Sequence, residues 1–333
     1  MRRFLLFIVF CFAAGTGFAA PVEVRLASIA PENSAWGKAL NQMAVEWKAA
    51  TGGQVILRVW HNGVLGGEEA VILQKLRTNQ IQAAVFTSSG MSNISKKLFT
   101  LSAPFLIRND DEMNYVLENV GGSLEEEIER SGFQLVAWSR IGWIRFFSRY
   151  PVSVPADLKR QKLSGSSDTP ELSNMFKTMG YTVVTTSFSD LLVALNSGTI
   201  DAIYQIPPFV ASMQLFGIIK NMMPLDIAPV MGGIVINQAT WRRIPERYRA
   251  KILEISRRIA SENDDGARQL SADSVSIMQR YGLVSTPLTK AQEQLWIDEA
   301  STAIPAMMND RNSALDAGIY RSIQNLLSAY RKR

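Results

Sequence analysis

The strongest constraint on this chain is a block between Leu158 and Pro208 in which short extended segments alternate with helical ones. Its pattern is strand, helix, strand and helix, and it stops abruptly at Pro207 and Pro208. Strands that alternate with helices build sheets with helices packed on their faces. The block therefore predicts an α/β fold.

The N-terminal third of the chain repeats this organisation. Apolar and polar residues alternate over residues 23–28, which predicts a first strand. A turn with a helix N-cap at Ser34 follows. Glycines at 52–53 end the helix, and residues 55–60 form the next strand. A second helix then precedes an apolar strand at 81–86. Two consecutive strand–helix–strand units are therefore expected here.

Two later segments extend the pattern. Residues 133–138 predict a strand that carries the chain toward a second lobe, with a crossing near Gly142. Residues 231–237 predict a strand with two glycines near its start, and a long helix follows from Trp241 through Ile259. With 333 residues, 47% of them hydrophobic, the chain is long enough for two lobes with real cores.

Several short sequence motifs occur in an order and spacing that resemble those of the solute receptors of tripartite ATP-independent periplasmic (TRAP) transporters, the DctP-like family. A further match is the proline and phenylalanine at Pro104 and Phe105. The similarity spans almost the whole exported chain and is densest at 55–105 and 157–208. Within residues 157–208, the matching motifs lie at residues 157–163, 180–184, 188–190, 194–198 and 200–202.

This resemblance implies a two-lobed periplasmic-binding-protein fold of type II-like architecture, with a cleft between the lobes. It also implies that C-terminal helices from residues 288–330 pack across both lobes. Lobe I is expected to comprise residues 20–141 and about 228–270. Lobe II is expected to comprise residues 142–227 and about 271–333, including the C-terminal helices.

The N-terminus has the pattern of a secretory signal. Two arginines precede an apolar run, and small residues lead to an expected cleavage site after Ala19, so residues 1–19 are interpreted as a signal peptide. The apolar run is too short for a transmembrane helix. Cys11 is the only cysteine, and bulky neighbours disfavour its lipidation. We therefore expect a periplasmic protein without a thiol or a disulfide.

Loops after strands are the candidate binding segments of the first lobe, because backbone N–H groups and helix N-termini point into the cleft there. They include Trp36, Ser88 and Ser89. Packing on the lobe surface is an alternative role for Trp36, and helix capping is an alternative role for the two serines.

In the second lobe, Trp143 and Arg145 lie in a segment that resembles the family's glycine, aromatic and arginine pattern, with one additional residue before the arginine. The clearest departure is Ser164. The resemblance implies an arginine at that position, where a guanidinium would hold a substrate carboxylate. A simple dicarboxylate is therefore not the expected ligand.

The segment after residue 202 is apolar and aromatic where the family often has acidic and amide residues. An uncharged or hydrophobic ligand is therefore expected, with a monocarboxylate held by Arg145 as the alternative. The candidate contacts in this segment are Tyr204, Gln205, Pro207 and Phe209.

No enzymatic motif is apparent. The sole histidine, His61, is interpreted as a surface residue, and the acidic groups at 110–112 and 264–265 as solvated carboxylates. Nucleotide loops, metalloprotease helices and nucleophile elbows are absent from the sequence, and no cofactor is expected. The positive charge is modest and dispersed, which disfavours a nucleic-acid partner.

The sequence thus predicts a receptor that closes on a small molecule and presents it to an integral membrane TRAP permease. An interaction protein of the same fold, working with an extracytoplasmic helper protein, is an alternative. A hydrolase that uses His61 or the paired aspartates is a third possibility with less support.

Overall fold

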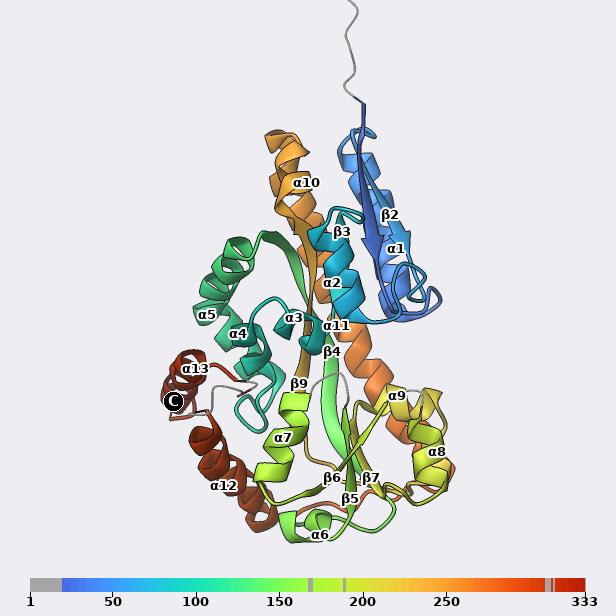
Figure 1. Ribbon diagram of the computed structural model, residues 1–333, viewed down its shortest axis with the longest axis vertical. Helices are drawn as coiled ribbons and strands as arrows, with labels where there is room; N and C mark the ends of the chain where they lie inside the picture. The colour runs from blue at the N-terminus through green and yellow to red at the C-terminus, as the bar shows by residue number, and fades with distance from the viewer. Residues whose placement is uncertain (1–19, 167–169, 188–189, 309–312, 314, 333) are drawn as a thin grey trace, which may run out of the picture.

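The fold is described from a computed structural model (Figure 1). The structure describes residues 20–166, 170–187, 190–308, 313 and 315–332. The predicted signal segment 1–19, with Cys11, lies outside the described residues, as do residues 188–189 of the motif at 188–190. The fold is a mixed α/β architecture with two lobes, as predicted.

Lobe I occupies the upper part of Figure 1. Its parallel strands lie in the order β2-β1-β3, and helices cover both faces. Its elements are β1 (Val22–Ala27), α1 (Ala35–Ala50), β2 (Val55–Trp60), α2 (Glu69–Arg77), β3 (Ala83–Phe86), α3 (Ser88–Ser92), α4 (Lys96–Phe99), the 3-10 helix η1 (Thr100–Ser102), α5 (Asp110–Arg130) and α10 (Gln238–Arg243).

Lobe II occupies the lower part of Figure 1 and repeats the parallel arrangement in the order β7-β5-β6. Pro207 and Pro208 end the preceding block, and they also form the first turn of a short helix. The elements are α6 (Pro155–Lys159), β5 (Lys162–Ser166), α7 (Pro170–Thr178), β6 (Thr182–Thr186), α8 (Leu191–Asn196), β7 (Ala202–Gln205), α9 (Pro207–Ser212), the 3-10 helix η2 (Leu215–Gly217) and β8 (Asn221–Met222).

Two long antiparallel strands, β4 (Phe133–Ser148) and β9 (Ala228–Asn237), run through both lobes and join them. β4 continues ten residues beyond the predicted strand and has register shifts on both sides of Trp138. The second shift precedes Gly142, whose φ of 147° a side chain would strain. On β9, a Cβ at Gly232 would lie 2.2 Å from the Phe86 carbonyl oxygen, so glycine permits this close approach.

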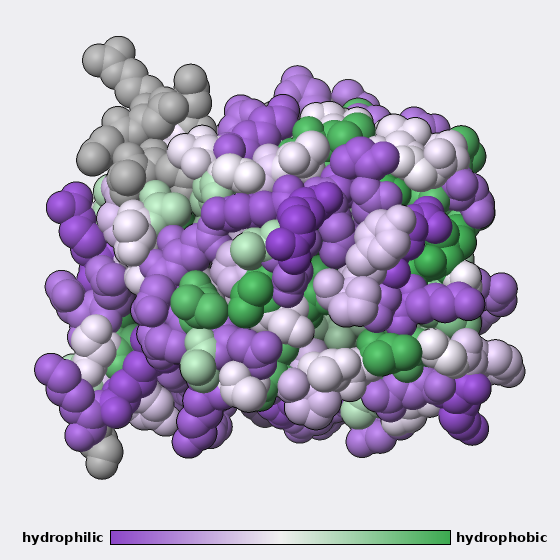
Figure 2. Space-filling model, turned by 90° about the horizontal axis from the view of Figure 1, so that it is seen from below, coloured by the Kyte–Doolittle hydropathy of each residue, from purple (hydrophilic) through white to green (hydrophobic). Residues whose placement is uncertain are grey.

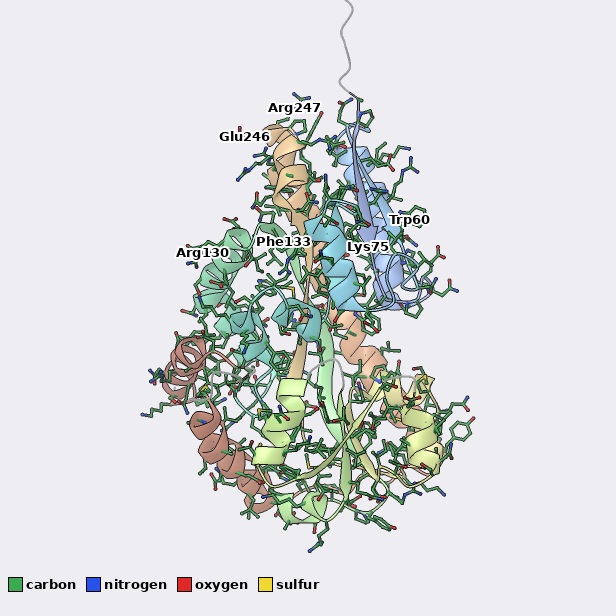
Figure 3. The ribbon with its side chains drawn as sticks, in the orientation of Figure 1. Trp60, Lys75, Arg130, Phe133, Glu246 and Arg247 are labelled. Atoms are coloured by element: carbon green, nitrogen blue, oxygen red, sulfur yellow. The ribbon has the colours of Figure 1, made fainter. Side chains whose placement is uncertain are left out.

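Three C-terminal helices bind the lobes together. The longest, α11 (Glu246–Arg280), contacts α1 in lobe I, α9 in lobe II and the long strand β4 that joins them. Figure 3 places its first residues, Glu246 and Arg247, at the far end of lobe I, beyond Phe133. α12 (Lys290–Met307) packs on α6 and α7, whereas α13 (Ala317–Tyr330) packs on α5. The expected packing of C-terminal helices across both lobes is confirmed.

The buried core has three clusters that cover the faces of the strands. One joins β1, α1 and α11 in lobe I, and a second lies beneath α8 and α9 in lobe II. The third and largest extends from α2 and α5 to α7 and α12, so it spans both lobes. A buried hydrogen bond from Trp47 Nε1 to Ser256 Oγ, 2.9 Å long, fixes α1 to α11.

Candidate ligand-binding site

The sheet topology turns the carboxyl edges of the two lobes toward each other. β3 and β4 are both antiparallel to β9, so β3 runs from lobe I toward lobe II. β7 is antiparallel to β4 and runs toward lobe I. The register places Trp138 opposite Gly233, next to the end of β3, and Arg145 opposite Gln205 at the end of β7. Seven residues of extended chain separate the two edges by about 20 Å.

Trp36 lies in the first turn of α1, directly after the loop that follows β1. The helix begins at Ser34, whose hydroxyl accepts a hydrogen bond from the Gly37 N–H at 3.1 Å. The Trp36 Nε1 atom is buried and has no hydrogen-bond partner within the described residues. A buried donor without a partner costs free energy, so the side chain of Trp36 is not fully satisfied by the described residues.

Ser88 and Ser89 begin α3 but differ in their contacts. The buried Ser88 hydroxyl donates to the Met231 carbonyl oxygen at 2.7 Å and accepts from the Met231 N–H at 3.0 Å. It also lies 2.8 Å from the Ser102 hydroxyl. Ser89 is half-buried, and its backbone carbonyl accepts from Ser92 Oγ at 2.6 Å. Ser88 therefore ties α3 to β9, and Ser89 is the more accessible of the two.

An acidic side chain that the sequence analysis did not select, Glu69, also occupies the lobe I edge. Its carboxylate accepts from the Thr87 N–H at 2.5 Å and from Thr87 Oγ1 at 2.7 Å. Thr87 is the residue after β3, so a negative charge is held at the carboxyl end of this strand. The sequence signal was the acidic pair at the start of the second helix, but its partner is distant in sequence.

Three of the predicted lobe II residues share one face of the sheet. Arg145 and Gln205 are directly paired, and Arg145 alternates in phase with Phe147, which packs in the cluster under α8 and α9. Ser164 pairs with Val184, which packs against the same cluster. Ser164 is only 8% exposed. These side chains therefore lie on the α8 and α9 face, near the carboxyl edge.

Arg145 has an internal partner. Its Nε donates to Asp226 Oδ1 at 2.8 Å, and the two side chains are 23% and 31% exposed. The charge at Arg145 is therefore balanced by a carboxylate, although both groups remain accessible to solvent.

The remaining lobe II candidates divide between the two faces. The Tyr204 ring packs 5.2 Å from Phe176 on the α7 face, opposite to Gln205. Phe209 packs against the cluster under α8 and α9, and Pro207 is buried at the start of α9. Pro207 is therefore a packing residue, whereas Tyr204 is half-buried on the α7 side and Gln205 and Phe209 are half-buried on the α9 side.

Trp143 takes part in a set of ionic contacts where β4 passes between the lobes. Its Nε1 donates to Asp110 Oδ1 at 3.3 Å. Asp110 also accepts from Arg268 Nη1 at 2.9 Å. We call Asp110, Arg140, Asp264 and Arg268 the crossover network, and these residues with Trp143 line a small surface pocket.

The centre of the crossover network is the contact between Arg140 and Asp264. The Arg140 backbone N–H donates to Asp264 Oδ1 at 2.9 Å, and its Nε donates to Oδ2 at 2.8 Å. Burial raises the pKa of the Asp264 carboxyl above its ordinary value, although the hydrogen bonds from Arg140 act in the opposite direction.

Two sequence interpretations are wrong. His61 is not a surface residue: it is 8% exposed, and its Nε2 lies 2.9 Å from Asn41 Oδ1. The acidic groups at 110–112 and 264–265 are not uniformly solvated either. Glu112 is buried and pairs with Arg331, and Asp264 is buried with Arg140. Residues distant in sequence supply these partners, which local pattern does not show.

Other kinds of site have no support among the described residues. No group of three or more histidine, cysteine, aspartate or glutamate side chains is placed to hold a metal ion in this part of the chain. Within the same residues, no helix has the length and apolar character needed to cross a membrane. Figure 2, seen from the lobe II end, shows a mainly hydrophilic surface with apolar residues in small groups, which need no functional explanation.

The two-lobed α/β fold, with strand ends that face each other, defines a solute-binding protein. A family model described as bacterial extracellular solute-binding protein, family 7, matches residues 26–310. The chain therefore belongs to this family, whose members serve as periplasmic receptors of TRAP systems and work with membrane permease subunits. The family consists of receptors rather than enzymes, in agreement with the sequence interpretation.

Individual relatives support the assignment. A solute-binding protein of Verminephrobacter eiseniae is 26% identical over 272 residues, which cover 80% of this chain and 79% of the relative. The C4-dicarboxylate-binding periplasmic protein DctP of Shewanella loihica is 23% identical over 316 residues, or 92% of each chain.

Solved structures show the same fold. A TRAP periplasmic solute-binding protein of Desulfovibrio salexigens, with bound orotic acid, has a TM-score of 0.82 at 19% identity and covers 92% of this chain and 99% of its own. The corresponding protein of Shewanella oneidensis, with bound succinate, has a TM-score of 0.79 at 19% identity, with the same coverage. The expected receptor fold is confirmed.

Proposed function

We propose that this chain captures a small uncharged or hydrophobic molecule between its lobes outside the cytoplasm and delivers it to a TRAP membrane permease. A ligand that contacts both lobe edges favours the conformation in which they approach, so capture is coupled to closure. The proposal includes export of the chain by the signal segment 1–19.

The observation that carries the ligand class is the neutral side chain at Ser164. The resemblance implies a carboxylate-binding arginine at this position, near the carboxyl end of the central lobe II strand. Replacement by a hydroxyl removes charge-assisted hydrogen bonds worth about 1.5–3 kcal/mol each. A ligand that depends on this anchor would therefore bind much more weakly here.

The other proposed contacts suit a mainly apolar ligand with a few polar atoms. Trp36 offers an aromatic ring and the unpaired Nε1 donor from lobe I, and Ser89 follows the neighbouring parallel strand β3 on the same edge. Gln205 and Phe209 offer an amide and an apolar ring from lobe II. Small-molecule sites commonly combine apolar surface with a small number of directional polar groups.

A monocarboxylate is the second candidate ligand. The observation in its favour is the Arg145 guanidinium, which remains 23% exposed beside Gln205. The two solved neighbours described above hold orotic acid and succinate, both carboxylic acids. This alternative requires the ligand to compete with Asp226 for Arg145.

Native mass spectrometry of the gently purified exported protein tests the proposal, because a captured molecule adds its own mass. The compound so identified and succinate are then compared by calorimetry and thermal unfolding. We expect a neutral compound to stabilise the fold by about 2.7 kcal/mol at a concentration 100 times its Kd. Tight binding of succinate without any neutral ligand would contradict the proposed ligand class.

A further inference from the structure

Asp226 lies in the segment between β8 and β9, 81 residues after Arg145 in the chain. Its carboxylate holds the Arg145 Nε at 2.8 Å. The position of this carboxylate relative to the strand is fixed by the backbone. The next residue, Ile227, donates its N–H to the Ile144 carbonyl oxygen at 2.9 Å and accepts from the Phe105 N–H at 2.7 Å.

The first of these backbone bonds joins the two residues that directly flank the ion pair. Ile144 precedes Arg145, and Ile227 follows Asp226. The two charged side chains are therefore brought together by strand register and do not meet through a mobile loop. Formation of the pair needs little additional ordering of the chain.

The position of Asp226 changes what Arg145 can bind. A ligand carboxylate near Arg145 would also lie near the Asp226 carboxylate, so attraction to the guanidinium would be opposed by repulsion of similar range. Asp226 already takes up the Nε donor that one arm of a bidentate carboxylate contact could use. At the other lobe edge, the Glu69 carboxylate adds a second negative charge.

We propose that Asp226 determines ligand specificity by acting as an internal carboxylate that masks Arg145 and excludes ligand carboxylates from the cleft. The inference rests on the proposed receptor function and deepens it. Loss of the guanidinium at position 164 removes one anion anchor, and Asp226 neutralises the other. A neutral ligand does not need an anion anchor, and the Asp226 carboxylate does not repel it.

The test compares the exported protein with Asp226→Asn and Asp226→Ser, using succinate, benzoate and D-glucuronate as probes in calorimetry. Both substitutions remove the internal negative charge. A double variant, Asp226→Asn with Arg145→Met, removes the unmasked guanidinium as well. Asp265→Asn is the matched control, because it makes the same charge change on a side chain that is 69% exposed and pairs with Arg268.

We expect affinity for at least one of the three carboxylates to rise about tenfold in the Asp226 variants, as one new charge-assisted contact predicts. The gain should disappear in the double variant and should be absent from Asp265→Asn. No gain in either folded Asp226 variant would overturn the inference. A gain that persists without Arg145, or one that Asp265→Asn reproduces, would also overturn it.

Circular dichroism and thermal unfolding establish which variants fold, and two different replacements at position 226 guard against a misfolded one. The proposed receptor function is tested separately, by native mass spectrometry of the unsubstituted protein. If that protein retains a neutral molecule in native mass spectrometry but the Asp226 variants gain nothing, only the specificity inference fails. If no form of the protein binds any small molecule, both proposals fail.

Discussion

The crossover network and the Arg145–Asp226 pair use the same chemical groups on one strand, five residues apart, in different surroundings. Arg140 binds Asp264 through both its backbone N–H and its Nε, and Asp264 is only 9% exposed. Arg145 binds Asp226 through Nε alone, and Asp226 is 31% exposed. The number of bonds and the exposure of the carboxylate separate the two pairs.

This difference indicates a division of labour along β4. Breaking a buried pair leaves a charge without solvent or a partner, so such pairs are essential to the fold once they are present. An accessible pair contributes little to stability because water screens it. The Arg140 side is therefore suited to hold the lobes in place, and the Arg145 side is suited to meet a ligand.

The largest expected effect comes from substituting the two arginines in turn. Arg140→Met should lower the free energy of unfolding by about 3 kcal/mol, because the buried Asp264 carboxylate would lose its ion pair with the guanidinium and keep only the hydrogen bond from the backbone N–H of residue 140. Arg145→Met should lower it by less than about 1 kcal/mol. Urea unfolding followed by circular dichroism measures both values. Equal losses in the two variants would break the comparison.

The two serines of α3 extend the comparison to lobe I. Ser88→Ala should destabilise the protein by about 2 kcal/mol, because the Met231 N–H and carbonyl groups would lose their buried partner. Ser89→Ala is the neighbouring control and should change stability by less than about 0.5 kcal/mol. A larger loss in Ser89→Ala than in Ser88→Ala would show that the structural assignment of these residues is reversed.

Much of the fold could be predicted from local sequence because strand periodicity, turn residues and caps act over a few positions. The strand that begins at Phe133 shows the limit. Its first six residues have a strand pattern, but Arg140 and Gly142 interrupt it, and pairing with β9 and β7 carries the strand on to Ser148. Tertiary pairing overrides the local pattern there.

The candidate site was less predictable for a related reason. The sequence showed that Ser164 stands where the family resemblance implies an arginine, because the flanking motifs fix its position in the chain. By contrast, Asp226 meets Arg145 across 81 residues, and Ser88 meets Met231 across 143. Such contacts depend on strand order and register, which a single sequence does not determine.

Substitution of Trp36 distinguishes a ligand contact from a packing residue. Trp36→Phe removes the unpaired Nε1 donor and keeps most of the aromatic surface. Because no described partner is lost, the free energy of unfolding should not fall by more than about 0.5 kcal/mol. Affinity for the compound found by native mass spectrometry should fall about fivefold, as loss of one hydrogen bond of about 1 kcal/mol predicts. Unchanged affinity would exclude a hydrogen bond from Nε1 to that compound.

The smallest expected effect is a pH dependence of the crossover network. The pKa of Asp264 is raised in the folded protein, so the folded state binds this proton more tightly than the unfolded state. The resulting stabilisation is complete below the unfolded pKa of about 3.9 and is lost as the pH rises through the higher folded pKa.

Relative to Asp264→Asn, which cannot titrate, the unsubstituted protein should therefore gain stability as the pH falls from about 7 to about 4. The gain should not exceed about 1 kcal/mol, because Arg140 opposes the effect of burial. Urea unfolding of the unsubstituted protein and of Asp264→Asn at both pH values measures the difference. A stability difference that shrinks on acidification would mean that the ion pair with Arg140 outweighs burial. The network would then depend on a charged Asp264, and burial would not be the dominant influence on its pKa.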